Sequence, residues 1–197
     1  MVFARAPVAG AVKTRLAVRL GEEGAARWHA AMTRAAVRTA LAARCGRVEL
    51  HATRRHASFR TLAVPVRLQR GRDLGERMAR ALRDALRRHA RAIVIGADCP
   101  PLAAADLRRA AQLLRGGCDV VLAPAEDGGY ALIGARRLRR ALFERIEWGG
   151  PHVLAQTRAA LRATGLRWRE LRTLWDVDRP ADLARVNRLR FFAAARR

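Results

Sequence analysis

The stretch Ala92-Ile93-Val94-Ile95-Gly96-Ala97-Asp98-Cys99-Pro100-Pro101 decides the fold. Its first four residues form an uninterrupted apolar run, which is typical of a strand that is buried on both faces of a parallel sheet. A glycine and two prolines then fix a turn, and Asp98 stands on it. Because ligands of α/β proteins bind beyond the carboxyl ends of the strands, we expect Asp98 to face a ligand.

Apolar strands and amphipathic helices alternate on both sides of this stretch. Strands are predicted at residues 2–4, 47–53, 64–69, 92–96, 119–123, 130–133 and 168–174, and helices at 14–20, 24–43, 74–90, 104–114, 136–143, 151–164 and 181–190. This order predicts an α/β sandwich with a mainly parallel sheet. The chain has 197 residues and contains neither repeats nor a low-complexity linker, so we expect one domain over residues 1–197.

The composition is that of a folded cytoplasmic protein. Apolar residues make up 51% of the chain, yet none of their runs is long enough to cross a bilayer. Met1 leads straight into the first predicted strand, which leaves no room for a signal peptide. The cysteines, Cys45, Cys99 and Cys118, are odd in number and do not follow a zinc-binding spacing, so we expect reduced thiols.

The formal net charge of +23 suggests a polyanionic partner. However, the arginines are spread at helical spacing opposite apolar residues, as Arg80, Arg83 and Arg87 are around Leu82 and Leu86. Solvated helix faces explain such a pattern, and aromatic residues, at 5%, are too sparse to form a stacking surface for bases. We therefore expect nucleic-acid binding to be nonspecific at most.

A lysine marks the first loop. Of the 40 basic Lys and Arg residues only Lys13 is a lysine, and it lies between a Pro/Gly loop and a predicted helix start. Gly10 allows close backbone approach, and Lys13 and Arg15 supply positive charge, which together predict a phosphate-binding loop. A Walker A loop is excluded, because Val12 precedes the lysine and Pro7 takes the place of the other glycine.

Carboxylates follow three of the predicted strands. Asp98 is a candidate ligand for a divalent metal, since Mg²⁺ typically takes one or two protein carboxylates and completes its shell with phosphates. The alternative for Asp98 is a plain turn residue; a helix cap is less suited to it, because Asp106 is better placed at the next helix start. The aspartates Asp176 and Asp178 are able to share a metal with Asp98, although Asp178 is also placed to cap the final helix.

Two further loops carry candidate polar groups. Glu126 and Asp127 precede Gly128-Gly129-Tyr130, and their carboxylates suit a sugar hydroxyl, a metal or a proton. A hairpin turn would explain the two glycines but not Glu126. In the strand-to-helix turn that begins at Gln69, this amide could contact a base edge, whereas Asp73 fits either the nucleotide or a helix cap.

Together these motifs resemble the bacterial glycosyltransferase-A-like (GT-A) group of small single-domain proteins, some of which are labelled arsenosugar-biosynthesis glycosyltransferases. That group is related to phospholactate guanylyltransferase and to the molybdenum-cofactor nucleotidyltransferases. The resemblance spans nearly the whole chain and lies in Phe3-Ala4-Arg5-Ala6-Pro7 through Lys13-Thr14-Arg15-Leu16, Asp73-Leu74-Gly75-Glu76-Arg77-Met78, Gly96-Ala97-Asp98-Cys99-Pro100, Pro124-Ala125-Glu126-Asp127-Gly128-Gly129-Tyr130 and Asp176-Val177-Asp178-Arg179-Pro180.

The resemblance implies a GT-A fold, which is a Rossmann-like three-layer α/β/α sandwich with a mixed, mainly parallel sheet. It also implies a nucleoside diphosphate sugar or a nucleoside triphosphate as donor, an acceptor that the motifs do not identify, and Mg²⁺ or Mn²⁺ as cofactor. The candidate site then contains Glu126 and Asp127 as catalytic residues, Ala4, Pro7, Gly10, Lys13, Arg15, Gln69 and Asp73 as nucleotide- and phosphate-binding residues, Asp98 and Asp178 as metal ligands, and Gly128, Gly129, Tyr130 and Trp148 as the acceptor or sugar loop.

Several positions depart from the group's pattern. Arg5 replaces the usual lysine, Ala9 a common second proline, and Arg179 a threonine, and the Ser-Thr pair that usually follows Trp148 is replaced by Gly149-Gly150. The chain also starts late, almost directly at Phe3, which suggests a missing or misassigned N-terminus.

The sequence favours a metal-dependent glycosyltransferase, with a pyrophosphate-releasing nucleotidyltransferase as the alternative. A non-catalytic polyanion-binding protein on a degenerate transferase fold is the alternative from another class, driven by the charge of +23. The base, the sugar, the acceptor and the oligomeric state stay open at this point.

Overall fold

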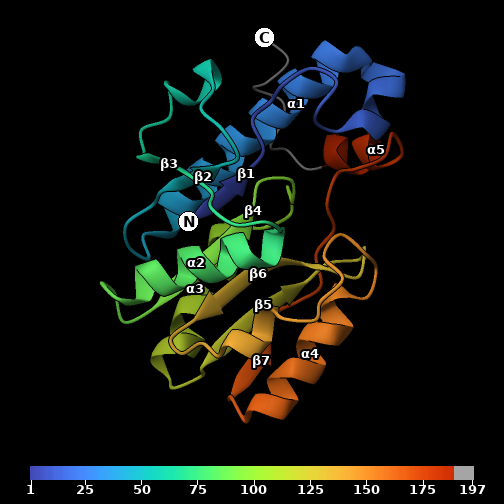
Figure 1. Ribbon diagram of the computed structural model, residues 1–197. Coiled ribbons are helices and arrows are strands. Elements are labelled where there is room, and N and C mark those ends of the chain that lie inside the picture. Colours follow the sequence, from blue (N-terminus) through green and yellow to red (C-terminus); the bar gives the residue numbers. More distant parts are fainter. Residues whose placement is uncertain (189–197) are drawn as a thin grey trace.

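The computed structural model of the protein describes residues 1–188, in which seven strands form one sheet with helices on both faces (Figure 1). The strands are β1 (Val2–Ala4), β2 (Leu50–Ala52), β3 (Val66–Leu68), β4 (Ala92–Gly96), β5 (Val120–Pro124), β6 (Tyr130–Ala135) and β7 (Trp168–Glu170). The helices are α1 (Thr14–Ala43), α2 (Leu74–Leu86), α3 (Ala104–Arg115), α4 (Val153–Thr164) and α5 (Asp182–Arg188), with short 3₁₀ turns η1 (Ala57–Phe59) and η2 (Arg140–Phe143). The predicted α/β/α sandwich is confirmed.

The strand order is β3-β2-β1-β4-β6-β5-β7. All neighbouring pairs are parallel except those of β6, which runs antiparallel to both β4 and β5. The carboxyl ends of the six parallel strands and the amino end of β6 therefore meet at one edge of the sheet. The sheet is mixed and mainly parallel, as predicted.

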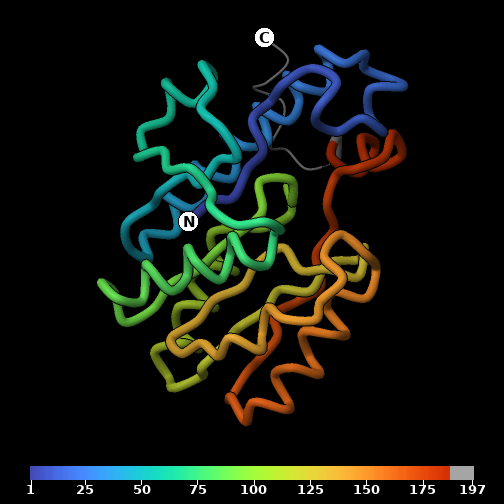
Figure 2. Tube along the Cα trace, viewed as in Figure 1, coloured from blue at the N-terminus to red at the C-terminus, as the bar shows by residue number. Residues whose placement is uncertain are grey.

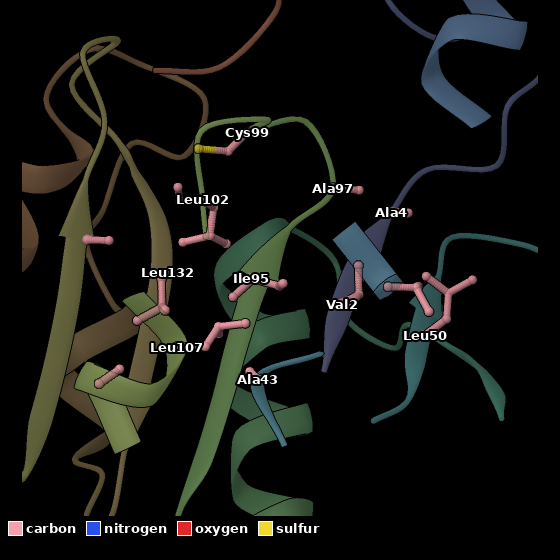
Figure 3. Close-up of a cluster of buried hydrophobic side chains, with 14 of the residues drawn as sticks. Val2, Ala4, Ala43, Leu50, Ile95, Ala97, Cys99, Leu102, Leu107 and Leu132 are labelled. Carbon is pink, nitrogen blue, oxygen red and sulfur yellow. The ribbon is translucent and has the colours of Figure 1, made fainter. Parts of the chain in front are cut away.

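Side chains that point alternately to the two faces of the sheet form two hydrophobic cores. In β4, Ile95 faces one core, while Ala92 and Val94 face the other. The first core lies under α1 and α3 and contains Val2, Leu50, Leu107 and Leu132 (Figure 3). The second lies under α2 and α4. Successive side chains of a strand point to opposite faces, so a strand that is covered on both sides must be apolar throughout, as 92–95 is.

A break in α1 gives it two parts. Gly21, with φ 68° and ψ 164°, interrupts the helix between the two segments predicted at 14–20 and 24–43. The first part lies beside α5 (Figure 2). Leu16, Val177 and Val186 share a small third core there. The last turn of the predicted helix 181–190 lies outside the described residues. No helix within residues 1–188 combines the length and the apolar character needed to span a membrane.

One predicted helix, at 136–143, is wrong. Strand β6 continues to Ala135, and the guanidinium of Arg136 donates from Nε to Oδ1 of Asp119 at 3.1 Å. The backbone N–H of Arg136 also donates to the carbonyl of Asp119, so the sheet pairing reaches one residue further. Only the 3₁₀ turn η2 then fits before Arg145, which takes a left-handed φ of 56°. Other elements begin or end a few residues away from their predicted bounds. Helix α2, for example, ends at Leu86, whereas residue 90 was predicted.

Candidate functional site

The candidate site lies at the edge of the sheet where the parallel strands end. The loop of residues 5–13 follows β1, and Asp98 follows β4 by two residues. The segment after β7 returns to this edge, where the backbone N–H of Val177 donates to the carbonyl of Asp98 at 2.9 Å. This hydrogen bond places Asp176 and Asp178 on either side of a residue that is joined directly to Asp98.

Lys13 bridges the first loop and these carboxylates. Its ammonium Nζ lies 2.9 Å from Oδ2 of Asp98 and 3.7 Å from Oδ1 of Asp178. Arg15 donates from a terminal nitrogen to the other oxygen of Asp178 at 2.6 Å. The Lys13 side chain is only 8% exposed, whereas those of Asp98 and Asp178 are 40% and 36% exposed. The structure thus brings together four of the predicted residues as two cations on two carboxylates.

The electrostatics follow from this pairing. Burial disfavours the charged ammonium of Lys13, but the carboxylates of Asp98, Asp178 and Asp176 outweigh it and raise its pKa. Burial likewise opposes ionisation of Asp98, but Lys13 outweighs it and lowers the pKa of that carboxyl. Both groups are therefore charged at neutral pH.

Asp176, which the sequence marks as able to share a metal with Asp98, also belongs to this group of carboxylates. Burial, followed by the nearby charges of Asp98 and Asp127, raises the pKa of Asp176 to about 6. Negative charge is therefore in excess at this point of the edge, although the whole chain is strongly basic.

A cavity of about 640 Å³ opens beside the Lys13–Asp98 pair. Six predicted site residues line it: Ala4, Lys13, Gln69, Asp98, Tyr130 and Asp178. Its wall also contains residues to which the sequence analysis assigned no role, notably Arg77 of α2, Thr53 after β2 and His29 of α1. Arg77 lies inside one of the quoted motifs, so its position in that motif was the available signal. No sequence motif pointed to Thr53 or His29.

The Gln69 amide is oriented by backbone carbonyls. Its Nε2 donates to the carbonyl of His51 at 2.8 Å and to that of Ala4 at 3.3 Å. Carbonyl oxygens and the amide oxygen Oε1 are all acceptors, so the two carbonyls must face Nε2, which fixes the orientation of the amide. Oε1 then remains available as an acceptor. Gln69 therefore ties the ends of β1 and β2 together and adds an acceptor to the cavity residues.

The other residues assigned to the nucleotide lie outside the cavity wall. Pro7 is buried within the first loop, and Gly10 has a φ of 74° that suits glycine. A Cβ at Gly10 would come within 3.2 Å of the Glu22 carboxylate. Asp73 caps α2, since its Oδ1 accepts the backbone N–H of Glu76 at 2.8 Å, which is the alternative noted from the sequence. Asp178 does not cap α5; the Asp182 carboxylate accepts the N–H groups there.

The two predicted catalytic carboxylates lie outside the cavity wall and are bound to other groups of the protein. Glu126 forms a two-pronged ion pair with Arg185 of α5 at 2.8 and 2.9 Å, and Arg185 also lies over the ring of Trp175. The hydrogen bond from Arg185 lowers the pKa of Glu126. Asp127 accepts the backbone N–H of Gly129 at 2.9 Å, which fixes the turn between β5 and β6.

The predicted acceptor loop is tightly packed. Gly128 has a φ of 86°, and a Cβ there would overlap the carbonyl oxygen of Pro151. Tyr130 meets the ring of Trp148 edge-on with centroids 6.4 Å apart. Trp148 in turn covers Gly75 of α2, where a Cβ would overlap the indole. Gly129 lies between these contacts, so the loop joins the start of β6 to α2 and α4.

The carboxylates of the site fit a divalent cation that takes only two ligands from the protein and the rest from water and phosphate. Within residues 1–188, no group of three or more His, Cys, Asp or Glu side chains is arranged to hold a metal ion. Asp98 and Asp178 nevertheless share one cationic partner, the Lys13 ammonium, so both already face a common positive charge. Two carboxylates with remaining ligands from water and phosphate is the usual Mg²⁺ arrangement.

Comparisons with known proteins identify the family of this chain and agree with its fold. Residues 15–150 match the profile of a family described as "Uncharacterized protein conserved in bacteria (DUF2064)". A search of curated proteins found no match. Among solved structures, a protein of Desulfovibrio desulfuricans G20 described provisionally as a nucleotide-diphospho-sugar transferase is 29% identical, with a TM-score of 0.88, covering 100% of this chain and 88% of the other.

Two more distant structures share the fold. One is a nucleotidyl transferase from Methanothermobacter thermautotrophicus, with 18% identity, a TM-score of 0.64 and coverage of 97% of this chain and 96% of the other. The other is a CMP:2-keto-3-deoxy-manno-octonic acid synthetase in complex with CTP, with 13% identity, a TM-score of 0.64 and coverage of 95% of both chains. This chain therefore shares its fold with both proteins.

Proposed function

We propose, from the premise that this chain belongs to the DUF2064 family of bacterial proteins, that it is a metal-dependent transferase with an activated nucleotide as donor. The observation that carries the proposal is the Lys13–Asp98–Asp178 cluster at the mouth of a cavity of about 640 Å³. A cavity of this size accommodates a nucleotide-sized ligand. Its position beyond the carboxyl ends of parallel strands is where such folds bind nucleotides.

The proposed roles follow from the contacts. Asp98 and Asp178 would hold Mg²⁺ or Mn²⁺, and Lys13 and Arg15 would then turn to the donor's phosphates. A bound divalent cation would stabilise the negative charge that develops on phosphate oxygens during transfer. Gln69 would accept a hydrogen bond from the nucleotide base through Oε1. These residues would act by positioning and by electrostatic stabilisation, since the cluster contains no free nucleophile.

We infer glycosyl transfer as the reaction, supported by the Desulfovibrio neighbour, which is the most similar of the three in fold and sequence. In that reaction an acceptor attacks the anomeric carbon and a nucleoside diphosphate leaves. In nucleotidyl transfer, which the other two neighbours suggest, an acceptor attacks the α-phosphate and pyrophosphate leaves. Identification of the released product separates the two: a nucleoside diphosphate supports glycosyl transfer, and pyrophosphate supports nucleotidyl transfer.

A thermal-shift screen of nucleoside triphosphates and nucleotide sugars, with and without Mn²⁺, tests the proposal. A ligand at about 100 times its Kd stabilises the native state by about 2.7 kcal/mol. At roughly 2–4 °C per kcal/mol for a chain of this size, the expected rise in Tm is about 5–10 °C. We expect the full rise when nucleotide and Mn²⁺ are present together, and a smaller rise with nucleotide alone. Absence of any metal-dependent shift across the whole panel would contradict the proposal.

Substitution of Lys13 by methionine should change two affinities in opposite directions. The variant loses the ammonium that the phosphates would contact, so the affinity for nucleotide in the presence of Mn²⁺ should fall about tenfold or more. It also frees Asp98 and one oxygen of Asp178, whose other oxygen stays with Arg15, so the affinity for Mn²⁺ alone should rise. Calorimetric titration of each ligand measures both. Methionine preserves the apolar stem of a side chain that is 8% exposed, and a parallel fall of both affinities would show that Lys13 only maintains the fold.

A further inference from the structure

The cations of the cavity wall fall into two groups. Lys13 is already paired with Asp98 and Asp178, and Arg15, just outside the wall, is paired with Asp178 as well. Arg5 and Arg77 line the same cavity and have no carboxylate partner among residues 1–188. The positive charge that is available to an incoming anion therefore lies on Arg5 and Arg77, not on the lysine that dominates the first loop.

Arg77 is held in place by neutral groups. It lies in the first turns of α2, where its Nε donates to the carbonyl of Gly71 at 3.0 Å. Gly71 fits tightly against this turn, since a Cβ there would come within 2.8 Å of the backbone nitrogen of Arg77. The half-buried guanidinium is therefore oriented through one nitrogen, and its two terminal nitrogens have no acceptor within residues 1–188.

Arg5 is fixed at its backbone. It follows β1 directly, and its carbonyl accepts a hydrogen bond from Nε2 of His29 at 3.1 Å. Its side chain is exposed, and within the described part of the chain it forms neither an ion pair nor a hydrogen bond. The Nε2–H of His29 is thus already used by the Arg5 carbonyl, and burial lowers the pKa of the His29 ring.

We propose that Arg5 and Arg77 form a metal-independent binding site for the phosphate groups of the nucleotide. The inference rests on the proposed function and adds an order to it: phosphate binds first to the two free guanidinium groups, while Lys13 stays on Asp98 until a divalent cation replaces it. Guanidinium groups suit this role because their planar N–H groups match phosphate oxygens in pairs.

The test measures nucleotide affinity in the presence of EDTA. GTP and UDP-glucose serve as probes of the two donor classes, and equilibrium dialysis or calorimetry gives the dissociation constant. We expect the unmodified protein to bind at least one probe without metal. Arg5→Gln and Arg77→Gln should each weaken that binding about tenfold or more, and Arg77→Lys should weaken it less. Each Gln variant should also flatten the dependence of affinity on salt, since one screened charge pair is lost.

Arg80→Gln is the matched control. Arg80 lies on the same helix, one turn after Arg77, but it is paired with Glu76 at 2.7 Å and is not part of the cavity wall. Its substitution should leave the affinity unchanged. The inference is overturned if the protein binds nucleotide only with Mn²⁺, or if both Gln variants bind as tightly as the unmodified protein in EDTA. Failure to bind either probe even with Mn²⁺ would count against the proposed function itself.

Discussion

Asp98→Asn should abolish metal-dependent nucleotide binding while leaving the protein folded. The change removes the carboxylate that is paired with Lys13 at 2.9 Å and replaces it with a neutral amide of the same shape. Asn retains an oxygen that can accept from the ammonium, and Asp178 still balances its charge, so the fold should persist. We expect the affinity for nucleotide in the presence of Mn²⁺ to fall about 100-fold or more, which corresponds to roughly 2.7 kcal/mol.

The control for this variant is Asp84→Asn. Asp84 is an exposed carboxylate of α2 whose ion pair with Arg87 is long, at 3.7 Å, so its loss should leave Mn²⁺-dependent binding unchanged. Titration calorimetry and thermal shifts measure both variants. If Asp98→Asn retains Mn²⁺-dependent binding, the metal assignment is wrong. Nucleic-acid affinity that falls steeply with salt and survives Asp98→Asn would instead support the polyanion-binding alternative.

Gly128→Ala should be the most destabilising single-methyl addition in the site. Gly128 has a φ of 86°, and the added Cβ would overlap the carbonyl oxygen of Pro151, which belongs to the backbone and cannot rotate away. The Gly128 carbonyl also accepts the N–H of Leu154 at 2.8 Å, so the loop cannot shift without loss of that bond. Backbone strain and overlap together should cost about 3 kcal/mol or more. The expected fall in Tm is about 10 °C.

Gly149→Ala separates the two causes of this effect. Gly149 has nearly the same φ, 90°, but no atom lies within 4 Å of its would-be Cβ. It should therefore show the backbone strain alone, about 1 kcal/mol, and a fall in Tm of roughly 3 °C. Urea unfolding of both variants measures the two free energies. Equal losses would mean that the contact between Gly128 and Pro151 relaxes without cost.

The sequence predicted the fold well where periodicity is strong. The strand at 92–96 appears within the same bounds, because a fully apolar run in a covered sheet has little freedom. The break in α1 at Gly21 was also visible, since the glycine separates two amphipathic segments. The prediction of a helix at 136–143 was wrong because Arg136 pairs with Asp119, which lies 17 residues earlier in the sequence. A local sequence pattern does not indicate such a contact. Tertiary contacts override local propensity at such points.

The site was predicted in part, for the same kind of reason. Motifs indicated Lys13, Arg15, Asp98 and Asp178 separately. The fold joins Lys13 to Asp98 across 85 residues of sequence and Arg15 to Asp178 across 163. The sequence could not show that Lys13 and Asp98 would form an ion pair with each other, because that pairing depends on the geometry of the first loop. Nor could it show that Arg185, from the last helix, would pair with Glu126. In a chain so rich in arginine, only its position inside the Asp73–Met78 motif distinguishes Arg77 from the many solvated arginines.

The antiparallel strand β6 has a consequence for how the candidate site can change. Because β6 separates β4 from β5, the carboxyl ends of β4 and β5, after which Asp98 and Asp127 follow, stand two strand spacings apart, roughly 9–10 Å. Backbone hydrogen bonds of the sheet fix this interval, and an exchanged 125–129 turn would preserve it provided that it keeps Gly128, which contacts Pro151 and Leu154. For the proposed reaction, the donor-binding half and the acceptor-facing half would then behave as independent modules. Grafting the 125–129 turn of a relative should redirect acceptor choice and leave nucleotide affinity intact.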